Sequence, residues 1–317
     1  MTQKIFVRNL KRILNKTVPL WVILVLIFYS SAGVGLIEYY IMKRNINTLS
    51  LELAKRTRSP EELVQILKQE VLPQKGYMLG AVWGDVGKKL IESGAIDKKK
   101  YEDLFSSEPQ TKDYMKYLKN SSKDHMVINE KNSHFMVNTL WALGLVNKSK
   151  ILDEGSMKKY ANGNVMNFAS TGGWSLGSKP TDKLYSSSKL IKLTPEQEEI
   201  VKKIASNIYR PCCNNNTEFP DCNHGMAALG YIQLAVSQGL SERKIYKDIL
   251  SLNSFWFPQN YVDIAAFFDK KGTSLGSVDP KTILSFEYSS AQGAQKIKQS
   301  IQSMPGFSTQ GAGGCGT

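Results

Sequence analysis

The stretch TPEQEEIVKKIASNIYRPCCNNNTEFPDCNHGMAALGYIQLAVSQG, residues 194–239, decides the fold of this chain. Thr194 followed by Pro195, with Gln197 three residues after the threonine, forms the capping box that starts a helix. One face of this helix is apolar and is expected to be buried, and it consists of Ile200, Val201, Ile204 and Ile208. Pro211 ends the helix, and an apolar second helix follows a cysteine-rich loop. The stretch therefore predicts a helix–loop–helix module.

The loop of this module holds three of the four cysteines of the chain and one of its three histidines. The spacing is C-C-x8-C-x-H. We expect Asp221 or Asn223 to cap the second helix, which places Cys222 and His224 at its N-terminus. Backbone N–H groups and the positive end of the helix dipole stabilise a thiolate there. The loop is therefore the candidate functional site.

Metal binding is the interpretation that uses most of these side chains. The thiolates of Cys212, Cys213 and Cys222 and the imidazole of His224 are four ligands of the types that zinc accepts. The thioether of Met226 and the surplus of sulfur shift the preference toward copper(I) or another soft metal. Because the side chains of adjacent cysteines are expected to diverge, they favour a closed zinc site less than a C-x-x-C turn does. The sequence therefore predicts a copper or zinc site.

Two alternatives stay open. In thiol–disulfide exchange one cysteine attacks and a second resolves, and Cys315, between glycines in GGCGT, is an auxiliary partner. In the structural alternative, Cys212 or Cys213 forms a disulfide with Cys222, which stabilises the fold by roughly 2–3 kcal/mol for a loop of about ten residues. A metal site or an exchange site implies a partner protein that carries metal or thiols. Whether the chain catalyses a reaction stays open.

Residues 204–250 resemble the small helical domain of the cytochrome c maturation thiol-oxidoreductase subunits and related cysteine-rich exported bacterial domains. The stop of one helix and the start of the next also match, at Gly239, Ser241, Glu242 and Ile245. The resemblance implies a three-helix domain whose cysteines handle thiols, haem ligands or metal near a membrane. The family separates its two cysteines by two residues and has no counterpart of His224, so its catalytic pair is not carried over. The remaining sequence resembles uncharacterised bacterial membrane proteins.

The N-terminal region predicts a membrane anchor. Residues 1–17 carry five basic side chains and no acid, and residues 18–37 carry no charge. A helix of about 20 residues spans roughly 30 Å, the thickness of the hydrocarbon core of a bilayer. We expect a single-pass signal anchor at 18–40 in the cell membrane, with a cytoplasmic N-terminus and an extracytoplasmic body. The alternative is a cleaved signal peptide with its apolar core at 18–29.

The body is expected to be all-α. A helix is predicted at 82–94, and the apolar segment 132–147 predicts a deeply buried helix. No β-type alternation is sustained. The expected organisation, from the N-terminus onward, is a basic leader at 1–17, the anchor at 18–40, a helical module at 45–160, an ordered connecting segment at 161–193, a helical cysteine-loop module at 194–303, and a flexible glycine-rich tail with Cys315 at 304–317.

Other features of the chain favour ordinary structural roles. The net charge is +13, and its lysines outside the leader are scattered as on a solvated surface. No recognition helix or basic-aromatic array is present, which argues against nucleic acid as a partner. His125 lies far from the loop in sequence, and His134 is expected to pack or to cap a helix, with a fifth metal ligand as the alternative. Trp256 and Phe257 are expected to pack in the core.

Overall fold

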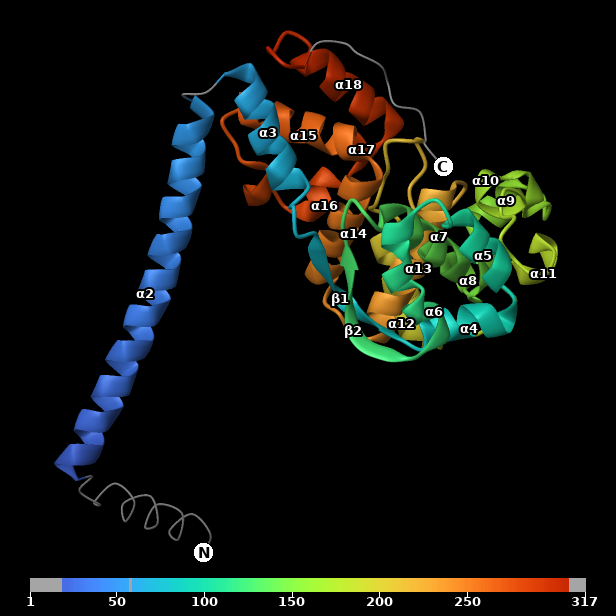
Figure 1. Ribbon diagram of the computed structural model, residues 1–317, viewed down its shortest axis with the longest axis horizontal. Coiled ribbons are helices and arrows are strands. Elements are labelled where there is room, and N and C mark those ends of the chain that lie inside the picture. The colour runs from blue at the N-terminus through green and yellow to red at the C-terminus, as the bar shows by residue number, and fades with distance from the viewer. Residues whose placement is uncertain (1–18, 57–58, 308–317) are drawn as a thin grey trace, which may run out of the picture. The chain divides into compact units, whose positions relative to one another are not determined.

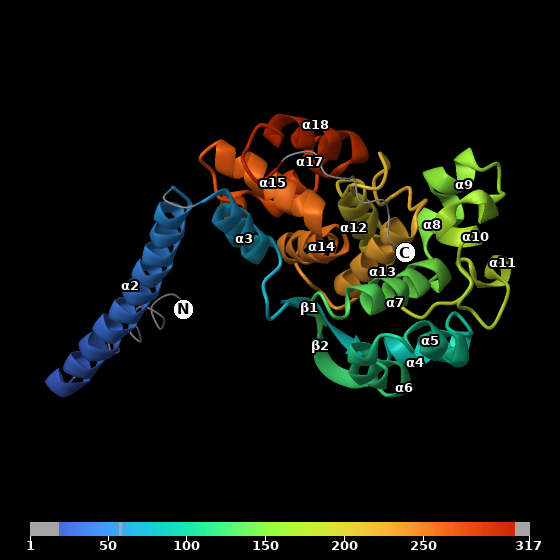
Figure 2. The ribbon, with the colours of Figure 1, turned by 45° about the horizontal axis from the view of Figure 1, so that its top comes forward.

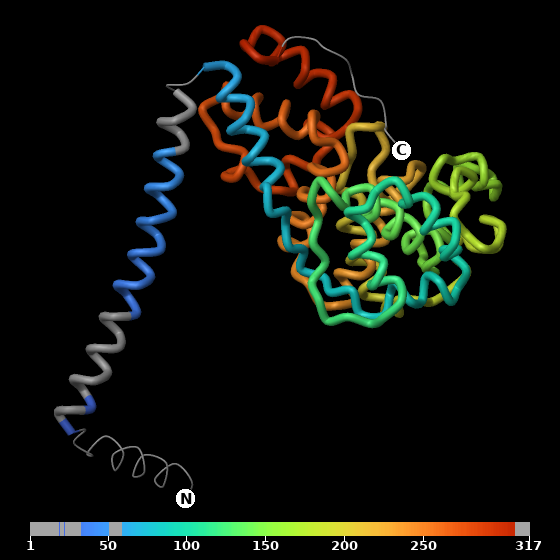
Figure 3. Tube along the Cα trace, viewed as in Figure 1, coloured from blue at the N-terminus to red at the C-terminus, as the bar shows by residue number. Residues whose placement is uncertain are grey.

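The computed structural model describes residues 19–56 and 59–307, without the side chains of residues 20, 21, 23–32 and 51–56 (Figure 3). The chain divides into two compact units, one through Ser59 and the other from Pro60. Helix is the main element of the described residues, as predicted (Figure 1).

The first unit contains the helix α2 (Leu20–Arg56). Among the described residues, no helix is both long enough and apolar enough to cross a bilayer. The predicted anchor at 18–40 is only partly described: residue 18 and the side chains of residues 20, 21 and 23–32 are not among the described parts of the chain. The basic leader at 1–17 lies outside it completely.

Two apolar helices, α7 (Ser133–Val146) and α13 (Asn223–Ser237), pack side by side at the centre of the second unit (Figure 2). Every residue of α7 from Phe135 onward is buried, which confirms the deep burial predicted for 132–147. Gly144 and Gly230 face each other, and a Cβ on either would collide with the backbone of the other helix. This close approach fixes where the N-terminus of α13 lies.

Other helices surround this pair. α12 (Pro195–Ala205) and α14 (Glu242–Trp256) pack against α13, and α15 (Pro258–Lys270) packs against α3 (Pro60–Val71) and α18 (Ala291–Ile301). The capping box of α12 is confirmed, since Thr194 Oγ1 accepts from Gln197 N at 3.3 Å and Gln197 Oε1 accepts from Thr194 N at 3.0 Å. The short elements near the C-terminus are η3 (Leu275–Ser277), α16 (Pro280–Ile283) and α17 (Phe286–Ser289).

The expectation of an all-α body is wrong at one place. β1 (Tyr77–Gly84) and β2 (Ser122–Ile128) form a two-stranded antiparallel sheet in which Tyr77 pairs with Ile128 and Gly84 with Ser122. Along β1 the buried residues alternate, as Leu79, Ala81 and Trp83. The helix predicted at 82–94 is therefore shorter, and α4 (Val86–Ser93) begins only after the strand, with Gly94 in the left-handed conformation at its end.

The remaining elements lie between these strands and after α7. Those between the strands are α5 (Lys98–Leu104), η1 (Pro109–Tyr114) and α6 (Lys116–Lys119). Those after α7 are α8 (Lys150–Glu154), α9 (Ser156–Tyr160), η2 (Val165–Asn167), α10 (Ala169–Gly172) and α11 (Thr181–Leu184). Within 161–193, Trp174 is buried and donates its indole N–H to Ala95 O at 2.9 Å. This bond ties the segment to the end of α4.

Candidate metal centre

The cysteine loop between α12 and α13 is held by backbone contacts with distant segments. Thr217 N donates to Ala205 O and Ile208 O, which closes the loop on the end of α12. Cys213 O accepts from Ala291 N of α18, and Asp221 O accepts from Ser170 N of α10. The loop therefore has one conformation that both sides of the unit support.

The sulfur atoms of three cysteines gather in this loop. Cys212 Sγ lies 3.4 Å from Cys222 Sγ and 4.0 Å from Cys213 Sγ. The adjacent side chains Cys212 and Cys213 thus do not diverge as the sequence led us to expect. All three cysteines are free of disulfide bonds in the structure and are partly buried.

The potential ligand atoms form two groups, within each of which all atoms lie within 4.8 Å of one another. One group contains Cys212, Cys222 and His224, and the other contains Cys213, Asp221 and Cys222. Cys222 belongs to both. Three of the predicted ligands, Cys212, Cys222 and His224, therefore lie in one group, whereas Cys213 lies with Cys222 and Asp221 in the other. This Cys/His cluster can hold a metal ion.

Cys222 is the N-cap residue of α13, in place of the predicted Asp221 or Asn223. Its Sγ accepts from Gly225 N at 3.4 Å. A sulfur atom at this position can accept a hydrogen bond from an otherwise unpaired N–H group of the first helical turn. The positive end of the helix dipole also stabilises negative charge on it. The cap residue was therefore predicted wrongly, although the expected location of the thiol at a helix N-terminus is confirmed.

A buried arginine that the sequence analysis missed lies beside this sulfur. Arg210 is only 1% exposed, and its Nε donates to Cys222 Sγ at 3.0 Å. Its other N–H groups donate to Asp221 Oδ1 at 2.6 Å, Asn215 O at 3.0 Å and Phe219 O at 3.2 Å. A side chain at Gly225 would collide with the guanidinium, so glycine is required there. Arg210 therefore connects the loop to the first turn of α13.

These contacts place negative charge on Cys222. Hydrogen bonds from the Cys212 and Cys213 thiols, followed by the charge of Arg210, hold the pKa of Cys222 well below its usual value despite burial. Hydrogen bonds to Cys213 and Cys222, together with burial, raise the pKa of Cys212. Burial alone would lower the pKa of Arg210, but the nearby sulfur and carboxylate charges raise it. The arrangement therefore favours the thiolate form of Cys222 and the protonated form of Cys212, beside a permanent cation.

His224 closes the cluster on the side of α14. It is 4% exposed, and its ring lies against Phe257 and Trp256, with centroids at 4.4 Å and 5.7 Å. Its Nδ1 is buried and has no hydrogen-bond partner among the described residues. Since an unpaired buried polar atom costs free energy, this nitrogen has an unmet need for a ligand. Trp256 and Phe257 pack against the site, with Phe257 buried as predicted.

The other candidate residues have different environments. Met226 is fully buried in the hydrophobic core on α13. Cys315 lies outside the described residues. His125 Nδ1 contacts Leu79 O at 3.1 Å within the sheet, and His134 Nδ1 pairs with Glu108 Oε1 at 2.7 Å. Neither of these two histidines belongs to the ligand groups found among the described residues.

One signal in the sequence could have identified Arg210. After residue 58 the chain has only two arginines, Arg210 and Arg243, among many lysines. Arginine is preferred over lysine for buried ion pairs because its planar fork makes several bonds at once. An arginine two residues before Cys212 was therefore informative.

Comparisons with known proteins give no relative. No family model, no curated protein and no solved structure matches this chain.

Proposed function

We propose that Cys212, Cys213, Cys222 and His224 bind one soft transition-metal ion, zinc(II) or copper(I), on a membrane-anchored extracytoplasmic protein. One observation carries the proposal: the sulfur atoms lie 3.4 Å and 4.0 Å apart beside an imidazole whose Nδ1 has no partner among the described residues. A tetrahedral ion about 2.3 Å from each sulfur would separate them by about 3.8 Å. The free thiols are therefore already near the spacing that an ion needs.

The charge of the cluster supports the same proposal. The lowered pKa of Cys222 favours its thiolate form, and the raised pKa values of Cys212 and Cys213 favour their protonated forms. Zinc(II) binding to all three sulfurs releases two protons, so the net charge of the cluster does not change. Arg210 stays hydrogen-bonded to the sulfur and orients it, as outer partners do in metal sites.

The test uses the full chain in detergent micelles under reductant. We expect one equivalent of zinc(II) or copper(I), measured by competition with a chromophoric chelator, and about two protons released per zinc(II) in weakly buffered solution. Cys222→Ser should weaken binding at least about tenfold because it removes the ligand that both groups share. Serine is also a good N-cap, so the variant should fold.

Two controls make this test specific. Cys315→Ser and His125→Gln should bind metal like the parent chain, whereas His224→Gln should bind it more weakly. Equal metal affinity in Cys222→Ser and the parent chain would overturn the proposal.

Thiol–disulfide exchange is the second candidate, and the lowered pKa of Cys222 favours it. The Cys222 thiolate would attack a partner disulfide and release one partner thiolate. Cys212, 3.4 Å away, would then attack the mixed disulfide, so that the partner leaves reduced and Cys212–Cys222 is oxidised. A Cys212→Ser variant should accumulate the mixed disulfide, which mass spectrometry detects. If the parent chain instead retains an unreactive Cys212–Cys222 disulfide, the loop is a structural brace.

We also propose the membrane anchor at residues 18–40. The support is the uncharged run at 18–37 after five basic residues, in a chain whose residues 20–56 form one helix. A membrane-impermeant thiol reagent tests the orientation in intact cells that express a variant with a single added cysteine. Labelling at residue 179 and no labelling at residue 4 is the expected result, and the reverse pattern would refute the extracytoplasmic body.

A further inference from the structure

A cavity of about 730 Å³ lies next to the cysteine cluster, and no pattern in the sequence predicted it. Its walls come from the end of α5, Glu108 just before η1, α7, residues 173–176, the first turn of α13 and the end of α14. His224 and Asn223 line it, so the cavity and the thiol cluster share the first turn of α13. Its volume is within the range of about 300–1,000 Å³ that is typical of small-molecule sites.

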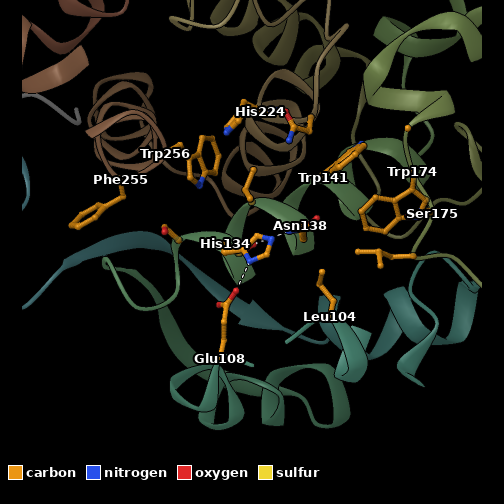
Figure 4. A pocket seen from close by; sticks show the side chains of 15 residues that line it. Leu104, Glu108, His134, Asn138, Trp141, Trp174, Ser175, His224, Phe255 and Trp256 are labelled. Carbon is orange, nitrogen blue, oxygen red and sulfur yellow. Dashed lines mark hydrogen bonds and ion pairs between the residues drawn. The ribbon is translucent and has the colours of Figure 1, made fainter. Parts of the chain in front are cut away.

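One wall of the cavity is aromatic and rigid. Trp141 and Trp174 lie side by side in Figure 4, with ring centroids 4.8 Å apart and planes at 67°. The indole N–H of Trp141 donates to Ser170 O at 2.7 Å, and that of Trp174 donates to Ala95 O at 2.9 Å. Both N–H groups are therefore satisfied by the protein, which fixes the two rings before any ligand arrives. A rigid aromatic surface binds a flat apolar face at low entropic cost.

The part of the lining next to Trp141 on α7 is polar. His134 projects into the centre of the cavity and is bonded to Glu108 below it, at 2.7 Å (Figure 4). Asn138, one turn further along α7, donates its NH2 group to His134 O at 3.0 Å and is 8% exposed. No partner of its Oδ1 occurs among the described residues, so this oxygen is a hydrogen-bond acceptor for a ligand. Ser133, Ser175 and Asn223 add further neutral polar groups.

Charge restricts the ligand further. The residues that line the cavity include no lysine and no arginine, although the chain is strongly basic. An anionic ligand would therefore find no positively charged side chain to pair with in the cavity. The only carboxylate in the lining, Glu108, is already engaged by His134, so a cation finds little free negative charge. The cavity therefore favours a neutral ligand.

We propose that this cavity binds a neutral sugar ring, as a free saccharide or as part of a glycan chain. The apolar C–H face of such a ring packs on Trp141 and Trp174. Its hydroxyl groups bond to Asn138 and to the His134–Glu108 pair. A planar apolar compound would cover these polar groups without pairing them, which costs free energy. The proposal does not depend on the metal centre.

The experiment is a titration of the full chain in detergent micelles, followed by tryptophan fluorescence. The probes are N-acetylglucosamine and its trimer and hexamer as neutral sugars, galacturonic acid oligomers as anionic ones, and glucosamine oligomers as cationic ones. We expect a saturable change with the neutral probes only. Tighter binding of the hexamer than of the single ring indicates a glycan chain as the source, and equal binding indicates a free saccharide.

Matched variants locate the binding. Trp174→Phe and Asn138→Leu should each weaken binding about tenfold, since each removes roughly one stacking contact or hydrogen bond. Trp83→Phe is the control, because Trp83 is buried against Tyr117 outside the cavity lining. It should leave the affinity unchanged. The absence of saturation with every neutral probe, or equal binding of the anionic probes, would overturn the proposal.

Discussion

Two ion pairs of this protein differ in which partner is buried, the cation or the anion. In the cysteine loop the cation is buried, with Arg210 at 1% exposure, and its partner Asp221 is 20% exposed. Under the sheet the anion is buried, with Asp248 at 0%, and its partner Lys244 is 35% exposed. A buried cation attracts further anions, and the thiols of the loop supply them. A buried carboxylate attracts donors, and here the backbone and the phenols supply them.

The two sites also differ in how completely their polar groups are paired. Asp248 Oδ2 accepts from Tyr231 Oη at 2.5 Å and from Gly80 N at 3.0 Å, while Lys244 Nζ binds Oδ1 at 2.5 Å. Those donors come from β1, α13 and α14, so the carboxylate joins three elements. In the loop, by contrast, His224 Nδ1 is unpaired among the described residues, and the raised pKa values of Cys212 and Cys213 favour protonated thiols. Complete pairing indicates a structural role, and incomplete pairing indicates a binding role.

The largest effect is expected from Asp248→Ala. The change leaves a buried phenol and a backbone N–H without their acceptor, and the Lys244 ammonium loses its carboxylate but keeps Tyr77 Oη and Met78 O. Removal of one partner from a buried pair costs about 3–5 kcal/mol, and we expect this loss in the free energy of unfolding measured with urea. Asp182→Ala is the matched control, since its ion pair with Lys183 is exposed and should contribute less than about 1 kcal/mol. Metal affinity of the folded Asp248→Ala protein should be unchanged.

A smaller loss of stability is expected from Arg210→Met. Asp221 is partly exposed and regains water, so we expect about 2–3 kcal/mol, the contribution of hydrogen bonds to charged groups. Without the guanidinium the pKa of Cys222 rises, because a source of positive charge is lost. Alkylation at pH 7 should therefore become slower at Cys222 in this variant. Faster alkylation would show that burial by Arg210, and not its charge, controls the thiol.

The stability should depend on pH through the same thiols. An unfolded cysteine titrates near pH 8.5, and the pKa of Cys222 in the folded state lies below that value. Between the two pKa values the unfolded state binds one more proton, so stability rises with pH by up to about 1.4 kcal/mol per unit and falls as the pH drops. The raised pKa of Cys212 acts in the opposite direction above about pH 8.5, where its contribution is lost as the pH rises.

Urea unfolding at several pH values tests this dependence in the reduced, metal-free protein. The free energy of unfolding should increase from pH 6 to a maximum near pH 8.5, a slope that comes from Cys222. In Cys222→Ser the increase should be smaller, while Cys315→Ser should keep the parent profile. A parent profile that is flat across this range would contradict a Cys222 thiolate at neutral pH.

Local signals predicted the parts of the structure that depend on neighbouring residues. Thr194 and Gln197 form the expected capping box because its bonds span only three residues. The clustering of Cys212, Cys213, Cys222 and His224 also followed from short spacings in one loop. β1 was missed because glycines interrupt its alternation and a helix begins two residues after it ends. The cavity was missed because its walls come from segments far apart in sequence, as Glu108 and His134 illustrate.

The smallest expected effect is a zinc-dependent change in the fluorescence of Trp256. It tests whether the unpaired His224 of the cysteine loop binds the ion. The ring centroid of Trp256 lies 5.7 Å from that of His224, so coordination of the imidazole should change the emission of this tryptophan. Since Trp256 is one of five tryptophans, the change should be a minor fraction of the total signal. Trp256→Phe should abolish the zinc-dependent change without weakening zinc binding, and Trp83→Phe should retain it. A zinc-dependent change that persists in Trp256→Phe would place the ion away from His224, because the ring of Trp256 lies against that imidazole, as does that of Phe257.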